Sequence, residues 1–337
     1  MVRIAMLAGL LLAVASCKTQ YQPQTVQVTD PGPPQRVLPT IRVLDGGMTP
    51  RAPLRYRVPP GQRETLYIEL ARAEAMQAGS QAAQSGLPPI QLQVKMGPAE
   101  PTREGFIRHP VEISQVRVSK VAEKMSPAQR EQVEASLARL LQIRGWSEMD
   151  VQGRIRRGEF EGADAVSPDM RALLGNIRSA LLSVPFPDEP LGVRARWEVE
   201  RKIQISGVWI DQVVTYHIER IRDGELDLQI TARGTAAPQQ IPSGRLEAYQ
   251  SSVIGSASVR LAYFTPHSEA EATTQMRISQ PTSMGDSRMI RVERRTAVAL
   301  YPGTEAHEFE AEEEPAKPED ANVVTDPGQQ QLKWYSP

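Results

Sequence analysis

The sequence predicts an α+β protein built on a large curled antiparallel sheet of about ten strands, with two helices on its concave face. Two observations lead to this prediction. Apolar and polar residues alternate with a period of two over most of the chain, and two segments carry a helical period instead. Strands that are apolar on one side are typical of antiparallel sheets. Ten strands spaced at about 4.8 Å would make a sheet about 48 Å wide, and two helices are too narrow to cover it if it is flat. We therefore expect the sheet to curl around the helices.

The alternation locates the strands. Leu66, Ile68 and Leu70 share one phase, and so do the apolar residues of several later runs: Ile90, Leu92, Val94 and Met96; Trp197, Val199, Ile203 and Ile205; Val253, Ala257, Val259, Leu261 and Tyr263; Met276 and Ile278; Ile290, Val292 and Val298. Between Val111 and Val118 the apolar phase changes, and a β-bulge near Ser114 would reconcile its two halves.

A hairpin is predicted around Asp223-Gly224. A two-residue turn with regular pairing would place Ile218 opposite Gln229, apolar against polar. A three-residue loop, Arg222 to Gly224, places apolar residues opposite one another: Ile218 with Leu228, Tyr216 with Ile230, and Val214 with Ala232. It also puts Glu219 opposite Asp227, and it uses Gly224 in the left-handed conformation. We favour the three-residue loop.

Two helices have clear start signals. Ser126, Pro127 and Gln129 combine an N-cap, a proline at the first helical position and a capping box, and Gly145 is the expected end. Ser167-Pro168 opens the second helix, which Pro185 ends. Their apolar stripes are Val133, Leu137, Leu140 and Leu141 in the first, and Leu173, Leu174, Ile177, Leu181 and Leu182 in the second. Met149 to Phe160, between the helices, is predicted as a short strand or hairpin.

The stripes leave two interpretations of the body open. If sheet and helices enclose a cavity, its lining includes Leu140, Leu141, Leu174 and Ile177, and the protein carries an apolar ligand. If these side chains are fully packed, the body is a scaffold.

The N-terminus has the pattern of an export signal. Arg3 precedes the 12 apolar residues Ile4 to Ala15, enough for a signal peptide and too few to span a bilayer. Val14-Ala15-Ser16-Cys17 resembles the lipobox of bacterial lipoproteins. This resemblance implies cleavage before Cys17, covalent diacylglycerol and an acyl chain on that residue, and anchoring to membrane lipid. Lys18 in place of aspartate favours the outer membrane, at its periplasmic face. Inner or outer membrane stays open, as does the leaflet.

The chain therefore divides into four predicted parts: a signal peptide (1–16), a lipidated cysteine with a flexible tether (17–51), the α+β body (52–304) and an acidic disordered tail (305–337). The tether is rich in Gln, Thr and Pro, and the tail holds nine of the 40 acidic residues. Basic residues in the body are scattered without interleaved aromatics, which argues against nucleic acid as a partner. The lone cysteine cannot form an internal disulfide.

The body has two further resemblances. A curled sheet around helices is similar in architecture to the half-barrel of bacterial lipoprotein carriers and related lipid-binding lipoproteins, which implies an apolar cavity. Pro185-Phe-Pro-Asp-Glu-Pro-Leu-Gly-Val-Arg-Ala-Arg-Trp197 resembles the start of the second half of uncharacterised bacterial lipoproteins of unknown-function families. Those families imply no chemistry for any residue.

No enzymatic motif stands out. His109, His217, His267 and His307 have no partners at metal-ligand spacing, and HExxH, Walker A, dinucleotide-binding and GxSxG motifs are absent. His217 is predicted on a polar strand face, and Gly285-Asp286-Ser287 is better explained as a turn than as a serine-esterase block. Arg154, Arg156 and Arg157 could bind a phosphate or carboxylate, but such a run is more typical of a solvated sheet edge.

We therefore expect a non-enzymatic envelope lipoprotein, without cofactor or metal, that binds or scaffolds an envelope protein or an apolar ligand. The alternatives are a periplasmic carrier of acyl chains or lipoproteins, and a cryptic envelope hydrolase.

Overall fold

A computed structural model describes residues 39–119, 125–161, 174, 183–205, 207–281 and 286–303. The chain divides into two units, Met1–Arg36 and Val37–Pro337, and all described residues belong to the second. They form one 14-stranded sheet, one α-helix with described bounds, and one 3-10 helix. The elements are β1 (Thr40–Asp45), β2 (Glu64–Ala78), β3 (Gln81–Met96), β4 (Glu100–Pro101), β5 (Ile107–Val118), α1 (Pro127–Leu137), η1 (Ala138–Gln142), β6 (Arg144–Met149), β7 (Ile155–Glu161), β8 (Arg196–Ile205), β9 (Val208–Arg222), β10 (Glu225–Ala236), β11 (Gln239–Ile241), β12 (Gly244–Arg260), β13 (His267–Pro281) and β14 (Ser287–Pro302).

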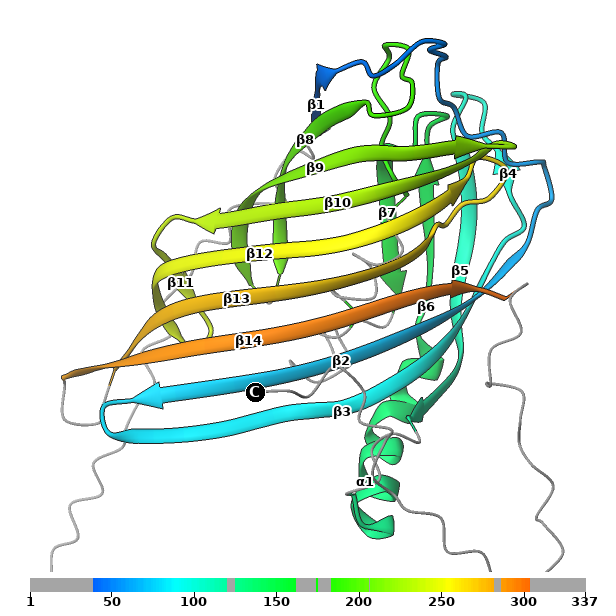
Figure 1. Cartoon of the computed structure of the whole chain (residues 1–337). Helices are drawn as coiled ribbons and strands as arrows, with labels where there is room; N and C mark the ends of the chain where they lie inside the picture. Colours follow the sequence, from blue (N-terminus) through cyan, green and yellow to red (C-terminus); the bar gives the residue numbers. More distant parts are fainter. Residues whose placement is uncertain are drawn as a thin grey trace, which may run out of the picture. The chain divides into compact units, whose positions relative to one another are not determined.

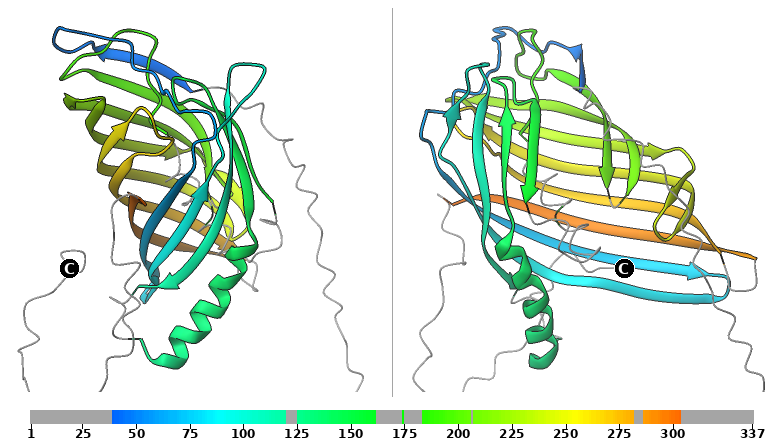
Figure 2. Two further views of the ribbon diagram at one scale, coloured as in Figure 1. Left: turned by 90° about the vertical axis from the view of Figure 1, so that its right-hand side faces the viewer. Right: turned by 180° about the vertical axis from the view of Figure 1, so that it is seen from behind.

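The sheet is antiparallel throughout and curls on itself. Its strand order is β1-β8-β9-β10-β12-β13-β14-β2-β3-β5-β6-β7, with β11 paired to β12 and β4 to β5. The long strands from β9 to β3 lie side by side, while β5, β6 and β7 turn across one end of them (Figure 1, Figure 2). Only one half of β3, Ile90–Met96, pairs with β5, so the other half of β3 has β2 as its single strand partner among the described residues.

The predicted curled antiparallel sheet is therefore confirmed, but the number of strands is wrong. The described residues form fourteen strands and not about ten, because β1, β4, β6 and β11 are too short to show alternation in the sequence. The prediction of two helices on the concave face is not matched there, since only the first helix has described bounds. It packs against β5 and η1 near one end of the sheet (Figure 1).

The start of the first helix follows its sequence signals, but its end does not. The Ser126 hydroxyl accepts a hydrogen bond from the Gln129 amide at 3.3 Å, and the Gln129 side chain accepts one from the Ser126 amide at 3.1 Å. After Leu137 the chain continues into η1, and Gly145 lies inside β6. There, a side chain would clash with the Phe160 ring of β7, so Gly145 permits close strand packing and is not the helix stop.

The second predicted helix, 167–185, lies outside the described residues, apart from Leu174 and residues 183–185. Leu174 is helical and buried in the core, with 4% of its surface exposed. Met149 to Phe160, predicted as a strand or hairpin, forms the β6–β7 hairpin together with the residues just before it.

Two local irregularities were predicted in the strands, and the structure contains the bulge in full and the hairpin in part. The bulge falls at Ser114, between the pairs Gln93–Gln115 and Val94–Ile113, and the Ser114 hydroxyl donates to the Gln93 side chain at 2.8 Å. In the β9–β10 hairpin the three predicted apolar pairs are correct, but the loop is not.

The β9–β10 loop is a two-residue turn of Asp223 and Gly224, both with positive φ, as a type I′ turn requires. The register shift that brings apolar residues together comes from a bulge at Glu219. As a result Arg220, and not Glu219, lies opposite Asp227, and the two form an ion pair. A turn and a bulge therefore produce the pairing for which we expected a three-residue loop.

The ordered body begins earlier than predicted. Strand β1 pairs with β8 inside the range 17–51 that the sequence assigned to a flexible tether. Ile41 and Val43 pack against the core from this strand. Two apolar residues are too few to establish a period, which is why the sequence did not reveal the strand.

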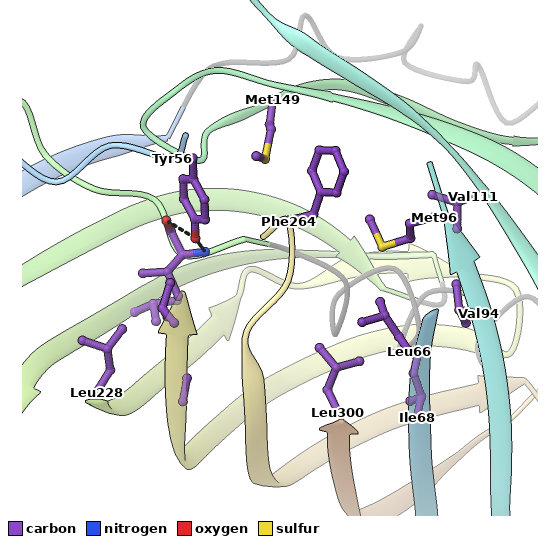
Figure 3. Close-up of a cluster of buried hydrophobic side chains, with 14 of the residues drawn as sticks. Tyr56, Leu66, Ile68, Val94, Met96, Val111, Met149, Leu228, Phe264 and Leu300 are labelled. Atoms are coloured by element: carbon purple, nitrogen blue, oxygen red, sulfur yellow. Dashed lines mark hydrogen bonds between the residues drawn. The ribbon is translucent and has the colours of Figure 1, made fainter. Parts of the chain in front are cut away.

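The largest core lies where β5, β6 and β7 face the long strands (Figure 3). Leu66 and Ile68 of β2, Val94 of β3 and Leu300 of β14 point into it, each with no exposed surface. Tyr56 joins it through its hydroxyl, which accepts a hydrogen bond from the Val184 amide at 3.0 Å and donates to the Val184 carbonyl at 3.3 Å. Burial raises the pKa of Tyr56, which stays a neutral hydrogen-bonding group.

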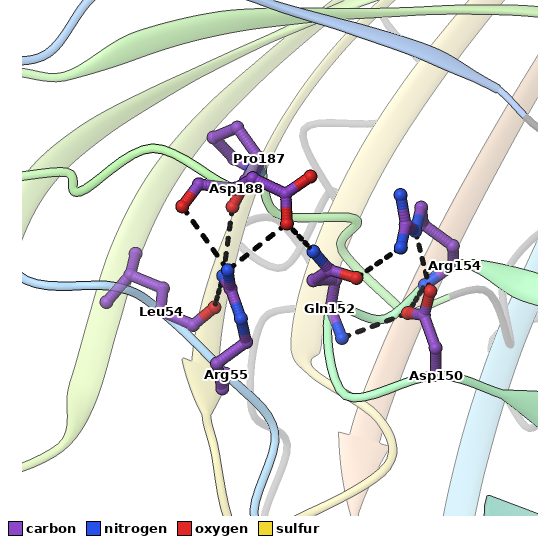
Figure 4. Close-up of polar contacts among 7 residues, drawn as sticks. All are labelled: Leu54, Arg55, Asp150, Gln152, Arg154, Pro187 and Asp188. Atoms are coloured by element: carbon purple, nitrogen blue, oxygen red, sulfur yellow. Dashed lines mark hydrogen bonds and ion pairs between the residues drawn. The ribbon is translucent and has the colours of Figure 1, made fainter. Parts of the chain in front are cut away.

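The segment from Pro185 to Trp197 closes this end of the core. Phe186 and Trp197 are fully buried, and the Trp197 indole donates to the Pro185 carbonyl at 2.9 Å. Polar contacts hold the same segment from outside (Figure 4). Arg55 donates to the Pro187 carbonyl at 2.9 Å, and Asp188 accepts from both Arg55 and Gln152. The segment from Pro185 to Trp197, which resembles uncharacterised lipoproteins in sequence, thus serves to pack the core.

Candidate functional site on the inner face of the sheet

We call the face that carries Leu66, Ile68 and Leu70 the inner face. Its residues are followed from strand to strand by the pairing register. Leu70 lies opposite Val298 of β14 and Ile90 of β3, and Val298 lies opposite Ala270 of β13. Most neighbouring outer-face positions hold polar or charged side chains, such as Glu69, Gln91 and Glu269.

Two apolar clusters lie on the inner face. The large cluster, at the end covered by β5 to β7, contains Leu66, Ile68, Leu70, Leu228, Leu300 and most of the other buried apolar residues. The small cluster, at the other end, contains Val208, Ile210, Ile241, Leu246, Met276, Ile278 and Val292. Six further apolar residues pack against the small cluster but are only half-buried: Met76, Ile203, Ile205, Ala236, Tyr249 and Ile290.

A polar belt separates the two clusters. It follows one register row across seven strands, through Arg201, Gln212, Gly234, Ser251, Thr274, Arg294 and Glu74. Arg72 and its partner Thr296 lie in the next row toward the large cluster. All of the belt's polar side chains are half-buried. The inner face is therefore amphipathic along its length, with apolar surface on both sides of a polar band.

The belt's charges are concentrated on β2 and β14. Arg294 donates from both Nε and Nη2 to Oε2 of Glu74 at 2.7 Å, and Nη2 of Arg72 lies 3.8 Å from the same oxygen. These side chains are 23%, 11% and 14% exposed for Arg294, Glu74 and Arg72. Two guanidinium groups thus share one carboxylate in a partly desolvated place, where charges interact more strongly than in water.

On the far side of the belt, Arg201 donates from Nε to the Gln212 side chain at 2.8 Å. Burial lowers the pKa of Arg201, yet a guanidinium stays charged at any ordinary pH. The belt and Arg72 beside it therefore carry three positive charges and one negative charge.

Sequence reasoning missed this belt, although a signal existed. Arg201 occupies the gap between Val199 and Ile203 in the apolar phase of β8, and Arg294 occupies the gap between Val292 and Val298 in β14. Arg72 and Glu74 continue the phase of Leu66, Ile68 and Leu70. Each charged residue at an apolar position could be seen in its own strand, but their alignment depends on the register.

The predicted cavity-lining residues do not form one group. Leu140 is fully buried in the large cluster and Leu174 nearly so, whereas Leu141 is 38% exposed. Ile177 lies outside the described residues. Leu140 and Leu174 are thus packed core residues, and the half-buried apolar residues of the inner face lie elsewhere.

His109 is the exception among the histidines. It lies near the start of β5 and is buried against Phe264, with 4.1 Å between ring centroids. Its Nδ1 atom has no hydrogen-bond partner among the described residues, and burial lowers the pKa of His109 to about 4. His217 is half-buried on the outer face, and His267 packs edge-on against Tyr301. His307 lies outside the described residues.

Arg154, Arg156 and Arg157 lie at a sheet edge, which agrees with the prediction of a solvated edge. β7 is a terminal strand, where Arg156 pairs with Glu104 and Arg157 with Glu148, while Arg154 in the preceding turn pairs with Asp150 at 2.6 Å. Asp286 and Ser287 lie at the β13–β14 connection, in agreement with a turn, and Gly285 is outside the described residues.

Neither a metal-binding cluster nor a pocket with several titratable side chains is found among the described residues. In the described ranges no three His, Cys, Asp or Glu side chains gather as a metal ion would require. An open depression of about 600 Å³ lies beside β1, lined by Val43, Gly46, Thr49, Arg51, Glu189 and Pro190. It is broad and brings no set of titratable side chains together.

The chain matches no known family model and no curated protein in sequence. Among solved structures, lipovitellin, described by its lipid-protein interactions, is similar over 73% of this chain and 25% of its own, with 10% identity and a TM-score of 0.39. A FadL homologue from Pseudomonas aeruginosa is similar over 71% of this chain and 89% of its own, with 8% identity and a TM-score of 0.20. The chain thus spans about a quarter of the lipovitellin chain. Likeness at this level carries no functional argument.

No helix among the described residues is both long and apolar enough to cross a membrane.

Proposed function

We propose that this protein is a non-enzymatic, lipid-anchored envelope protein that binds an acyl chain, or a similar apolar ligand, on the inner face of its sheet. The anchor is the lipid on Cys17, and the location is the periplasmic face of the outer membrane. Neither a cofactor nor a nucleic acid takes part.

One observation supports the ligand: the half-buried apolar residues around the small cluster. Met76, Ile203, Ile205, Tyr249 and Ile290 come from four different strands, and all lie on the inner face. Apolar surface left partly in contact with water favours an apolar partner, at about 25 cal/mol for each Å² that is buried. A pure scaffold would instead have such side chains packed, as most are in the large cluster.

The middle of the inner face also leaves room for a chain. Six inner-face positions in the middle of β10, β12 and β13 hold small residues: Ala232, Gly234, Ser251, Gly255, Ala270 and Ala272. Ile230 and Val253 lie among them, so the small side chains lower parts of the surface between the two clusters.

The test uses two neighbouring residues on opposite faces. Ile290 is a half-buried inner residue, and Met289 is an outer residue that is 47% exposed. The chain from residue 17 onward, with Cys17→Ser to keep it unlipidated, is titrated with the fluorescent methyl ester of cis-parinaric acid.

We expect saturable binding that Ile290→Asn weakens about tenfold, from the loss of a buried apolar side chain, and that Met289→Asn leaves unchanged. Absence of saturable binding, or equal weakening by both substitutions, would contradict the proposal.

The anchor is tested separately in cells. Because only a thiol can receive the diacylglycerol, Cys17→Ser should leave the precursor uncleaved and unlabelled by radioactive palmitate. Normal processing of this variant would disprove the lipoprotein assignment.

A further inference from the structure

Among the described residues, the polar belt and the row beside it hold three arginines and one acid, Glu74. Arg294 and Arg72 both approach Oε2 of Glu74, at 2.7 and 3.8 Å. Two guanidinium groups close to one carboxylate oxygen in a partly desolvated place make this part of the inner face locally positive. Such a surface is complementary to a further negative group.

Arg294 is placed to accept such a group. Both of its bonds to Glu74 go to the same oxygen, Oε2. A guanidinium has five N–H donors in a flat fork that matches a carboxylate or phosphate, so the two bonds leave donors for a second acceptor. The Arg294 side chain is 23% exposed, which keeps it accessible from the inner face.

Along β14, the inner-face neighbour of Arg294 is apolar on one side. Val292 belongs to the small cluster, whereas on the other side Thr296 separates Arg294 from Val298, which packs against the large cluster. On the neighbouring strand, Met76 lies opposite Val292. A ligand held at Arg294 would therefore have apolar surface directly beside its charged end.

The position also lies near an open margin of the sheet. Glu74 pairs with Ser85 of β3, in the half of β3 that has no second strand neighbour among the described residues. Residues 81–86 are all exposed. A charged headgroup can thus reach the belt from this margin without crossing the covered large cluster.

We propose that Arg294, supported by Arg72, binds the anionic oxygen group at the end of an acyl chain, and that the chain itself lies on the small cluster. This inference rests on the proposed function and names its ligand class: an acidic amphiphile and not a neutral one. Glu74 holds Arg294 in place in the empty protein and competes with the ligand for it.

The experiment compares two probes with the same acyl chain and different headgroups, the anion of cis-parinaric acid and its neutral methyl ester, on the Cys17→Ser chain from residue 17 onward. The acid should bind about tenfold more tightly than the ester, as one charge-assisted hydrogen-bonded pair allows. Arg294→Gln should bring the ratio of the two affinities, acid to ester, close to one. The matched control is Arg295→Gln, the next residue on the outer face, whose side chain is 67% exposed.

Glu74→Gln gives a second test with the opposite sign, and it does not depend on the folding of the Arg294 variant. Removing the competing carboxylate should tighten binding of the acid and leave the ester unchanged.

The outcomes separate the two proposals. If both probes bind equally and neither inner-face variant changes their ratio, the headgroup site is wrong and the apolar binding face stands. If Arg295→Gln lowers the preference as much as Arg294→Gln, the effect is general surface charge and the site is again wrong. If neither probe binds, the proposed function itself fails.

Discussion

The two ends of the inner face are made from the same alternating strands but differ in how they are covered. At one end, β5 to β7, η1 and the segment from Pro185 to Trp197 pack onto the long strands, and Ile68, Leu92 and Leu300 have no exposed surface. At the other end, Met276 and Ile278 remain 8% exposed, and most of their apolar neighbours are half-buried. Alternation therefore marks which face is apolar, but it does not decide whether that face is filled by the protein or left for a ligand.

The difference assigns separate roles to the two ends. The large cluster supplies the stability of the fold, because fully buried side chains make the most contacts. The small cluster and the belt can be changed with less damage, and binding sites commonly occupy such less stable regions. Three predictions test this division, from the largest expected effect to the smallest.

The largest effect is expected in the large cluster, where two adjacent leucines offer a matched pair. Leu140→Ala should lower the free energy of unfolding by about 2–5 kcal/mol, because it removes a fully buried side chain and leaves a cavity. Leu141→Ala, at a 38% exposed position, should cost less than ~1 kcal/mol. Denaturant unfolding of both variants measures the difference. Similar losses would show that η1 does not pack as described.

The next effect is the pH dependence that His109 gives to the large cluster. Burial lowers the pKa of His109 to about 4, so the unfolded chain takes up a proton near pH 6.5 that the folded protein resists. Its contribution to stability is therefore present above pH 6.5 and is lost as the pH falls toward 4, by about 3 kcal/mol in total.

The measurement is the unfolding free energy at pH 7.5 and pH 4.5 in the parent, His109→Leu and His217→Gln proteins. Burial raises the pKa of Glu64, an effect of opposite sign that is common to all three. We expect His109→Leu to lose less stability on acidification than the other two. An equal loss in all three would mean that His109 is not buried in solution.

The smallest effect is expected at the other end of the inner face. Ile278→Ala should cost about 1–2 kcal/mol in the ligand-free protein, less than Ile68→Ala at the same residue type in the large cluster, because its surroundings are less tightly packed. Thermal or denaturant unfolding of the two variants is sufficient. If the two costs are equal, both ends are packed core, and the contrast on which the binding proposal depends disappears.

Sequence reasoning was most successful where local chemistry is sufficient. The N-cap at Ser126, the bulge at Ser114 and the apolar phases of β2, β3 and β8 follow from neighbouring residues alone. It was less successful where two local solutions give the same pairing, as in the β9–β10 hairpin, and where an element has too few residues to show a period, as in β1.

The candidate site could not be predicted because it is a property of the register. A single arginine in an apolar phase, such as Arg201 or Arg294, looks like an isolated exception within its own strand. Only the pairing across seven strands aligns these exceptions into one belt and brings Glu74 to 2.7 Å from Arg294, a residue 220 positions later. Register is fixed by turns, bulges and burial along the whole sheet, and each one-residue shift would move a side chain to the other face.

The sequence by itself determined that the body is an antiparallel sheet with one apolar face, because period-two alternation has that single outcome. It also predicts lipidation of Cys17, because Val14 to Cys17 resembles a lipobox, a local motif that needs no fold. The tertiary structure decided which part of the apolar face is covered. It placed α1 beside β5 and left the apolar residues around the small cluster half-buried, because covering depends on where β5 to β7 and η1 dock. Docking depends on contacts between residues far apart in the chain, which no local pattern encodes.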